Sequence, residues 1–175
     1  MDSVAAARLR ESMTGPVLPI RELLFVCTGN ICRSPMAEWL LRKLLEDRPI
    51  IEVQVRSAGF IALPGNTATH LAMVVAKEHG VDLERHQAQP LAPSLIREAD
   101  LILVMEPEHR WELLYHRPEA ASKVFLLRHF APSGDRDRAI ADPYGRDLEA
   151  YRSCFQEIRE CVEALFDWLS GVRCG

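Results

Sequence analysis

The most constraining feature of this chain is a short apolar segment that runs directly into a loop with two cysteines. Residues 23–26 read Leu-Leu-Phe-Val, which favours a buried strand, and Cys27 follows them at once. Five residues separate Cys27 from Arg33, and a segment of helical period then begins. In such a strand-loop-helix unit, the N–H groups of the loop and the positive end of the helix point at the same spot. A phosphate group and a cysteine thiolate are both stabilised there.

Apolar strand-like runs alternate with longer helical segments along the rest of the chain. We expect strands at residues 23–26, 51–55, 101–105 and 124–127, and helices at residues 35–47, 67–79, 107–116 and 148–169. Strands that alternate with helices imply right-handed crossovers and a parallel sheet with helices on both faces. At 175 residues the chain suits a single domain. The predicted fold is therefore α/β: one three-layer domain whose four-stranded parallel sheet is flanked by helices, with a phosphate-binding loop after its first strand.

Three local signals set the expected ends of these elements. Ser34 is a suitable N-cap for the first helix, and Pro35 suits its first turn because the missing N–H has no partner there anyway. Gly80 stops the second helix in the position after the C-cap, where a left-handed residue is favoured. Residues 57–59, Ser-Ala-Gly, are expected to turn the chain out of the second strand. The first helix is thus expected immediately after Arg33.

Composition and charge argue against several classes of protein. A net charge of -4, with basic and acidic residues mixed, disfavours a nucleic-acid binder, which usually has a basic stripe. The longest stretch without charged residues, 57–76, contains proline, glycine and histidine, so we do not expect a membrane span. Residues 1–19 lack the apolar segment of a secretory signal and are expected to be a leader, or an early start with Met13 as the alternative. We expect a cytoplasmic protein whose domain covers residues 20–175.

The loop residues have the chemistry needed to transfer a phosphoryl group to sulfur. A thiolate attacks phosphorus only when ionised, and a free cysteine, with a pKa of about 8.5, is mostly protonated at neutral pH. The helix dipole, the loop N–H groups and Arg33 would stabilise the Cys27 anion, and a guanidinium matches two phosphate oxygens. The leaving group then needs a proton from a carboxylic acid on another loop. Asp142 is the strongest candidate, because Pro143 stiffens the backbone beside it and Tyr144 can line the pocket mouth.

Two motifs carry a resemblance to a known family. Residues 26–35, Val-Cys-Thr-Gly-Asn-Ile-Cys-Arg-Ser-Pro, and residues 142–144, Asp-Pro-Tyr, resemble the bacterial branch of the low-molecular-weight protein tyrosine phosphatases. The similarity extends from about residue 21 to the last helix, with further matches at residues 57–59 and at residues 77–80, Lys-Glu-His-Gly. It implies an enzyme that hydrolyses phosphorylated proteins through a phosphocysteine, with no metal or organic cofactor.

The resemblance also implies a role for each matching residue. Cys27 would be the nucleophile, Arg33 the phosphate ligand, and Asp142 the general acid and then the base. Ser57 and His79 would support the loop in a hydrogen-bonded network that includes an asparagine of the loop. The other residues of the phosphate-binding loop would be Thr28, Gly29, Asn30, Ile31, Cys32 and Ser34, the last of which would support the thiolate.

Cys32 raises the question of redox control. It lies on the same tight loop as Cys27, and a reversible disulfide between them would protect the nucleophile from over-oxidation, which the resemblance supports. A zinc site lacks ligands, because the remaining cysteines are Cys154, Cys161 and Cys174. Cys154 and Cys161 lie seven residues apart on the last helix and are expected in the core.

The expected pocket residues leave two substrates open. Ile31 gives the loop an apolar wall, as in family members that act on phosphotyrosine, whereas relatives that act on phosphoarginine have threonine there. Other segments, including residues 142–145, look closer to the arginine phosphatases. Leu63 and Gly145 stand where many tyrosine-specific members have aromatic residues, so an aryl substrate would lose stacking contacts. With Ile31, Leu63 and Tyr144 as the pocket, we favour phosphotyrosine and keep phosphoarginine as the alternative.

Two other functions fit the loop less well. Arsenate reductases share this fold and loop but need two further cysteines on a mobile segment midway along the chain. No cysteine lies between Cys32 and Cys154. A phosphoprotein-binding module without catalysis would tolerate the loss of Cys27, Arg33 or Asp142, and all three are present. The sequence therefore favours an enzyme, and it does not indicate an oligomeric state.

Overall fold

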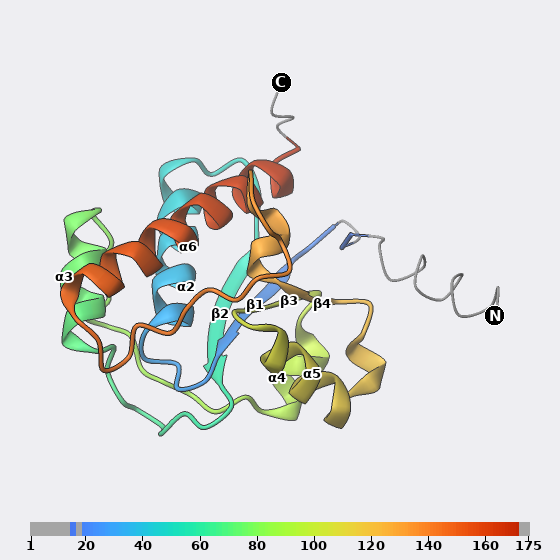
Figure 1. The fold of residues 1–175 in the computed structure, drawn as a ribbon. Coiled ribbons are helices and arrows are strands. Elements are labelled where there is room, and N and C mark those ends of the chain that lie inside the picture. The colour runs from blue at the N-terminus through green and yellow to red at the C-terminus, as the bar shows by residue number, and fades with distance from the viewer. Residues whose placement is uncertain (1–14, 17–18, 172–175) are drawn as a thin grey trace.

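A parallel sheet of four strands forms the middle layer of the molecule in the computed structural model, which describes residues 15–16 and 19–171 (Figure 1). The strands are β1 (Glu22–Cys27), β2 (Gln54–Gly59), β3 (Leu101–Val104) and β4 (Val124–Leu126). They lie in the order β2-β1-β3-β4, and every neighbouring pair is parallel. The predicted fold class, one α/β domain with a four-stranded parallel sheet, is confirmed.

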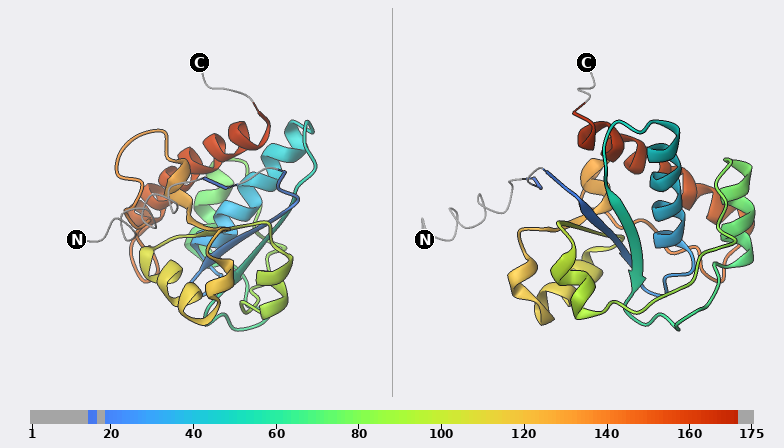
Figure 2. Two further views of the ribbon diagram at one scale, coloured as in Figure 1. Left: turned by 90° about the vertical axis from the view of Figure 1, so that its right-hand side faces the viewer. Right: turned by 180° about the vertical axis from the view of Figure 1, so that it is seen from behind.

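Helices cover both faces of this sheet, as the three views show (Figures 1 and 2). One layer contains α2 (Arg33–Asp47), α3 (His70–Glu78) and α6 (Leu148–Leu169). The other contains α4 (Pro93–Glu98) and α5 (Pro107–His116), with the short 3-10 helix η1 (Pro118–Ala120) between α5 and β4. A second 3-10 helix, η2 (Leu127–Phe130), follows β4 and packs against α6 in the first layer. The long helices α5 and α6 begin and end where the periodicity predicts. The single short turns of α4, η1 and η2 were not predicted, because they are too brief to show a period.

The central strand β1 shows why the sheet must be covered on both sides. Its side chains alternate between the two faces, so Leu23 and Phe25 join the core beneath α2 and α6, while Leu24 and Val26 join the core beneath α4 and α5. All four are buried. A strand that is apolar at every position is typical of a parallel sheet between two helical layers.

The sheet order also determines where a ligand can bind. β1 pairs with β2 on one side and with β3 on the other. The chain segments that follow β1 and β3 therefore diverge at the carboxyl edge of the sheet, and this is where open α/β sheets bind their ligands. Cys27 is the last residue of β1, so it lies at that point.

Several expected boundaries are wrong. β2 begins at Gln54 instead of residue 51, and α3 begins at His70 instead of residue 67. Residues 57–59 do not turn the chain away; they belong to β2, with Gly59 paired to Cys27 of β1. The small Ser-Ala-Gly side chains let this strand end lie close beneath the loop after β1. The expected N-cap is also wrong, because α2 begins at Arg33 and Cys32 occupies the N-cap position without a side-chain cap. Gly80 does follow the C-cap of α3, with a positive φ of 73°.

The expected leader, residues 1–19, lies almost wholly outside the described residues, and so does Cys174. Within the described ranges, no helix combines the length and apolar character needed to cross a bilayer.

Candidate active site

The Cys27 thiol lies at the carboxyl end of β1 and is 2% exposed. Its Sγ is 3.0 Å from the hydroxyl oxygen of Ser34, which sits in the first turn of α2. The Ser34 side chain is turned toward this sulfur and does not cap α2. The Asn30 amide donates to Ser34 Oγ at 2.9 Å, which leaves the Ser34 proton free to point at the sulfur. A thiolate is a good acceptor for that proton.

Asn30 holds the loop in a conformation that most residues avoid. Its φ is 54°, in the left-handed region, and it is the only non-glycine with a positive φ among the described residues. Its buried amide donates to Ser34 Oγ and, at 2.8 Å, to Ser57 Oγ. Its side-chain oxygen accepts from the N–H of Gln89 at 2.9 Å. These bonds offset the cost of the strained backbone, which is of order 1–3 kcal/mol.

A buried carboxylate, Glu38 of α2, lies beneath this network. Ser57 Oγ donates to Glu38 Oε2 at 2.5 Å, and Arg42 forms an ion pair with the other oxygen at 2.7 Å. Burial raises the pKa of Glu38, while the Ser57 hydrogen bond and the Arg42 charge act in the opposite direction. The Ser57 hydroxyl thus accepts a hydrogen bond from Asn30 and donates its only proton to Glu38.

The supporting histidine is His86, and the expectation for His79 is corrected. The exposed ring of His79 stacks on Phe155, with ring centroids 4.6 Å apart, on the side of α3 that meets α6. His86 is buried, and its Nε2 lies 2.7 Å from the backbone oxygen of Asn30. Because a carbonyl only accepts, His86 Nε2 carries the proton. The local match at residues 77–80 pointed to the wrong histidine because the chain returns to the loop only after α3.

Arg33 is the largest fully buried side chain of the described residues, at 1% exposed. Its Nη1 donates to Glu106 and, at 3.0 Å, to the backbone oxygen of Ile140, and its Nη2 pairs with Asp142 Oδ2 at 2.8 Å. Burial opposes the charge, but the Glu106 hydrogen bond and the Asp142 and Cys27 charges raise the pKa of Arg33 overall. Its buried Nε has no acceptor within the described part of the chain. An N–H held in this way suits a phosphate oxygen.

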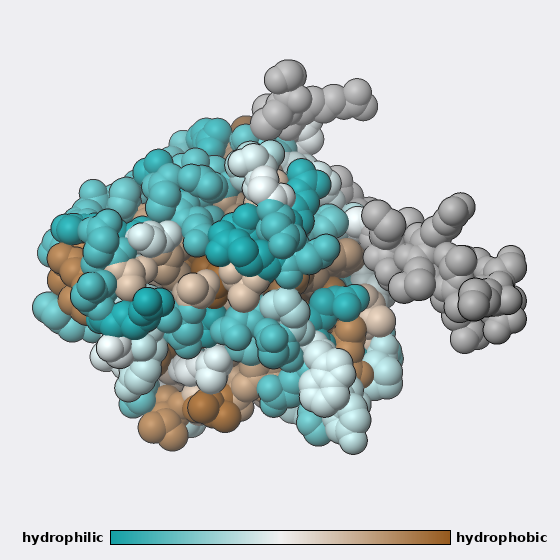
Figure 3. Space-filling model, viewed as in Figure 1, coloured by the Kyte–Doolittle hydropathy of each residue, from teal (hydrophilic) through white to brown (hydrophobic). Residues whose placement is uncertain are grey.

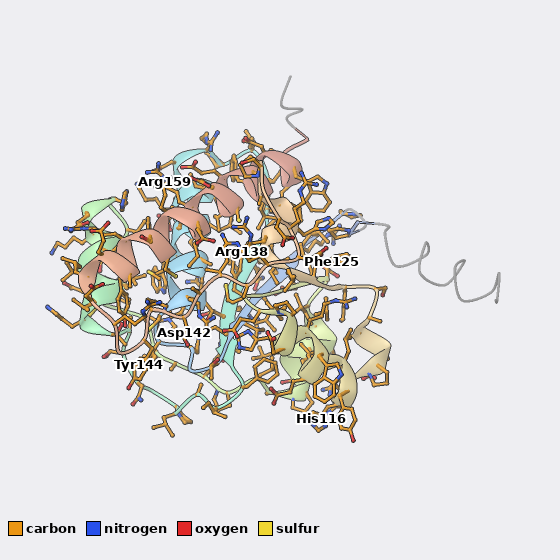
Figure 4. All side chains as sticks on the ribbon, viewed as in Figure 1. His116, Phe125, Arg138, Asp142, Tyr144 and Arg159 are labelled. Carbon is orange, nitrogen blue, oxygen red and sulfur yellow. The ribbon has the colours of Figure 1, made fainter. Side chains whose placement is uncertain are left out.

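Asp142 reaches this arginine from a loop that precedes α6. The loop is anchored at Ile140, whose N–H donates to the oxygen of Met105 just beyond β3 at 2.9 Å. The Asp142 side chain is 42% exposed, and its second oxygen accepts from the Tyr144 N–H at 3.1 Å. Figure 4 shows Asp142 and Tyr144 on this loop, with Tyr144 farther from the sheet. The structure thus brings Cys27 and Arg33 of one loop together with Asp142 of a distant one.

Residues that follow β3 complete the site, and the sequence analysis missed them. Glu106 binds Arg33, and His109 Nε2 lies 2.9 Å from the Thr28 hydroxyl oxygen. The His109 ring stacks on Phe60, with centroids 5.3 Å apart. The available signal was topological: residues just after a strand next to β1 lie at the same edge of the sheet as Cys27.

The Cys32 thiol faces away from the loop, toward two hydroxyl groups of the helical layer. Its Sγ is 3.4 Å from Thr69 Oγ1 and 3.4 Å from Tyr151 Oη. Burial raises the pKa of Cys32, and the two hydroxyl contacts only partly offset it. Cys27 and Cys32 are both free thiols here. Cys154 and Cys161 are buried in the core as expected, and burial raises the pKa of Cys161 to about 11.

Apolar side chains surround the mouth of the loop. Ile31 is half-buried, while Ile61 and Leu63 are 73% and 67% exposed and Tyr144 is 65% exposed. In Figure 3 hydrophobic atoms gather at the lower edge of the molecule, over the loop that follows β2. The backbone N–H of Ile61 donates to the oxygen of Thr28 at 3.0 Å, so this rim is attached to the phosphate-binding loop itself. Within the described ranges, no three His, Cys, Asp or Glu side chains are grouped to hold a metal ion.

Comparison with known proteins agrees with this geometry. The family model for low molecular weight phosphotyrosine protein phosphatases matches residues 22–172. The chain belongs to this family. The predicted family and enzyme class, a cysteine-dependent phosphatase, are confirmed.

Relatives within the low-molecular-weight phosphatases carry two kinds of name. A probable low-molecular-weight protein-tyrosine-phosphatase, EpsP of Ralstonia nicotianae, is 40% identical over 88% of this chain and 97% of its own length. A protein-arginine-phosphatase of Geobacillus stearothermophilus is 38% identical over 87% of this chain and 97% of its own. The crystal structure of the Erwinia amylovora tyrosine phosphatase AmsI superposes with a TM-score of 0.79 at 34% identity, over 89% of this chain and 97% of that one.

Proposed function

We propose that this phosphatase hydrolyses phosphotyrosine in proteins through a phosphocysteine at Cys27. The observation that carries the proposal is the Arg33 side chain. It is buried within the loop that begins at Cys27, and it is ion-paired to Asp142 at 2.8 Å. One guanidinium therefore links the candidate nucleophile to the candidate acid.

In the first half-reaction, the Cys27 thiolate attacks phosphorus in line with the tyrosine oxygen. The sulfur–phosphorus bond forms, the phosphorus–oxygen bond breaks, and Asp142 gives its proton to the departing phenolate. Arg33 and the loop N–H groups stabilise the negative charge on the phosphoryl oxygens. Phosphoryl binding would draw Arg33 Nη2 away from Asp142, which leaves this carboxyl group free to carry the proton.

In the second half-reaction, a water molecule attacks the phosphocysteine. Asp142, now ionised, takes a proton from this water, and the phosphorus–sulfur bond breaks. The products are inorganic phosphate and the Cys27 thiolate, which Ser34 stabilises at 3.0 Å. The cycle consumes one water and needs no other reactant.

The choice of phosphotyrosine rests on the pocket wall. Ile31 is a half-buried apolar residue within the phosphate-binding loop, and the rim residues Ile61, Leu63 and Tyr144 are exposed. An aromatic ring gains from burial against such an apolar wall. Phosphoarginine is the second candidate, because relatives named as arginine phosphatases are about as similar to this chain as those named as tyrosine phosphatases.

We further propose that the partners are phosphorylated proteins and that the enzyme works in the cytoplasm. A reaction that uses a cysteine thiolate as nucleophile needs that thiol reduced, which supports a reducing compartment.

The first test is turnover of p-nitrophenyl phosphate. Cys27→Ser should abolish it, because a serine hydroxyl in this loop is a far weaker nucleophile than a thiolate. Cys161→Ala is the matched control, since this buried cysteine belongs to the core and its loss should leave turnover per folded molecule unchanged. Persistent turnover in the Cys27→Ser protein would rule out the proposed mechanism.

The substrate is tested by a side-by-side assay of phosphotyrosine and phosphoarginine peptides. We expect the unmodified enzyme to prefer phosphotyrosine and Ile31→Thr to raise the rate on phosphoarginine. An unmodified enzyme that already prefers phosphoarginine would replace the main proposal by its alternative.

A further inference from the structure

His109 lies buried beside the phosphate-binding loop, and the proposed mechanism does not use it. It is 6% exposed, in the first turn of α5, and its Nε2 is 2.9 Å from the Thr28 hydroxyl oxygen. The ring is stacked on Phe60, with an interplanar angle of 25°. Phe60 is itself held to the loop, because its N–H donates to the oxygen of Cys27 at 3.2 Å. The imidazole is therefore held in place both at its edge and at its face.

The two ring nitrogens of His109 have different surroundings. Nδ1 is buried and has no hydrogen-bond partner in the part of the chain that the structure describes. A proton on Nδ1 would be a buried donor without an acceptor, which is costly. The proton of the neutral ring therefore belongs on Nε2, where Thr28 Oγ1 accepts it. The carboxylate nearest to Nε2, Glu106, is 3.9 Å away, beyond hydrogen-bond distance.

Thr28 Oγ1 then receives two donors. Arg33 Nη2 lies 3.4 Å from this oxygen, so His109 and Arg33 together take up both of its lone pairs. The Thr28 proton must point in a third direction. Among residues 15–16 and 19–171, the Thr28 hydroxyl has no hydrogen bond besides those with His109 and Arg33. Because the same Arg33 nitrogen pairs with Asp142, this spare proton lies next to the groups that act on the phosphoryl group.

We propose that the Thr28 hydroxyl donates a hydrogen bond to a phosphoryl oxygen of the substrate, and that His109 is a positioning residue that sets this direction. The inference rests on the proposed function and adds to it a side-chain donor in a loop that otherwise binds phosphate through its backbone and Arg33. Donation from both His109 and Arg33 polarises the Thr28 hydroxyl and makes it a better donor.

The charges around His109 are consistent with a neutral ring. Burial lowers its pKa, and Arg33 of α2 acts in the same direction. The carboxylates that face it, Glu106 ahead of α5, Glu112 within α5 and Asp142 on the loop before α6, act in the opposite direction but do not reverse the shift. A neutral ring with its proton on Nε2 is the state that the geometry requires.

The test compares two substitutions at Thr28. Thr28→Val keeps the shape but removes the hydroxyl, and Thr28→Ser keeps the hydroxyl. We expect Thr28→Val to lower kcat/KM for p-nitrophenyl phosphate by about 10- to 100-fold, the value of one hydrogen bond to a charged group. Inhibition by inorganic phosphate should weaken in the same variant. Thr28→Ser should retain most of both. Thr67→Val, at an exposed position before α3, is the matched control.

The role of His109 is tested by a double-mutant cycle. His109→Phe can still stack on Phe60 but has no donor, so it should lower kcat/KM in the wild-type background and have little further effect in the Thr28→Val background. His109→Gln retains a donor amide and should restore part of the loss. Equal effects of His109→Phe in both backgrounds would show that it acts only on the fold.

The inference is overturned if Thr28→Val matches the unmodified enzyme in kcat/KM and in phosphate inhibition. That comparison does not depend on whether the His109 variants fold. A failure of this inference is distinct from a failure of the proposed function, because the proposed function is decided by the turnover of the unmodified protein and of Cys27→Ser.

Discussion

At the scale of single residues, Asn30 is the position on which the loop depends most. Its backbone is left-handed. The nitrogen and the oxygen of its side-chain amide, and its backbone oxygen, all form hydrogen bonds. Asparagine tolerates this conformation better than other side chains do. The family resemblance implied that Asn30 and Ser57 belong to one network. It could not identify the histidine, because His86 is 56 residues away and only the folded chain brings it to Asn30.

A pair of alanine substitutions separates the two histidines. His86→Ala removes a buried hydrogen bond and should lower the free energy of unfolding by about 1–3 kcal/mol. It should also lower kcat/KM, since Asn30 loses a restraint. His79→Ala loses the ring stack on Phe155 and an exposed 3.4 Å contact between its Nδ1 and Arg159 Nη1, and should cost about 1 kcal/mol or less, with kcat/KM unchanged. Urea unfolding and p-nitrophenyl phosphate assays measure both, and the opposite order of effects would contradict the assignment of His86.

At the scale of elements, the end of β2 supports the phosphate-binding loop from below. Gly59 pairs with Cys27, and a Cβ at this position would lie 2.7 Å from the oxygen of Thr28 and 2.8 Å from the nitrogen of Asn30. Both are backbone atoms of the loop. The sequence suggested a turn here because glycine usually marks one; the structure shows instead a close approach of two backbones, which glycine also permits.

Gly59→Ala should therefore displace the loop. We expect kcat/KM to fall about 100-fold, because a shift of about 1 Å in a catalytic group has an effect of that size. The free energy of unfolding should fall by about 1–3 kcal/mol, as for other overpacked sites. Steady-state kinetics and chemical unfolding of the same preparation give both values. A variant with wild-type kcat/KM would show that the loop does not need this close contact.

Helix starts show a second difference between local pattern and fold. Ser34 followed by Pro35 is a good local signal for a cap, yet the structure begins α2 two residues earlier, at Arg33, and turns the Ser34 hydroxyl to Cys27. The contact with sulfur exists only because β1 and α2 meet at the loop. The bounds of α5 were predicted correctly, but not that its first turn supplies His109 to the site.

At the scale of the whole molecule, Asp100 joins the two central strands at the edge opposite the active site. Its Oδ2 accepts from the N–H groups of Glu22 and Arg21 at 3.0 and 2.8 Å, and its own N–H donates to the oxygen of Glu22. These hydrogen bonds hold the pKa of Asp100 below its usual value. Stability from this group is present above its ordinary pKa and is lost as the pH falls through its lowered value in the folded state.

Asp100→Asn should accordingly have a pH-dependent effect. At pH 7 we expect a loss in unfolding free energy of about 1 kcal/mol or less, because the exposed carboxylate is screened by solvent. The difference from the unmodified protein should begin to shrink as the pH falls below about 4, the ordinary pKa of an aspartate, and should vanish once the carboxylate of the folded protein is protonated at its lower pKa. Urea unfolding at several pH values measures this, and a difference that stays constant with pH would argue against the ionised carboxylate as its source.

Over the whole chain, the sequence by itself determined the order of strands and helices, the single α/β domain, and the candidate trio Cys27, Arg33 and Asp142. Periodicity and short-range spacing are local properties, and residues 27–33 form one loop whose spacing places the cysteine and the arginine together. Asp142 was a candidate through its local Asp-Pro-Tyr motif, but only the fold brings it within 2.8 Å of Arg33. Tertiary structure alone decided that Glu106, His109 and His86 reach this loop, because each comes from a segment more than fifty residues away. Their contacts depend on strand order and side-chain direction, which no local pattern contains.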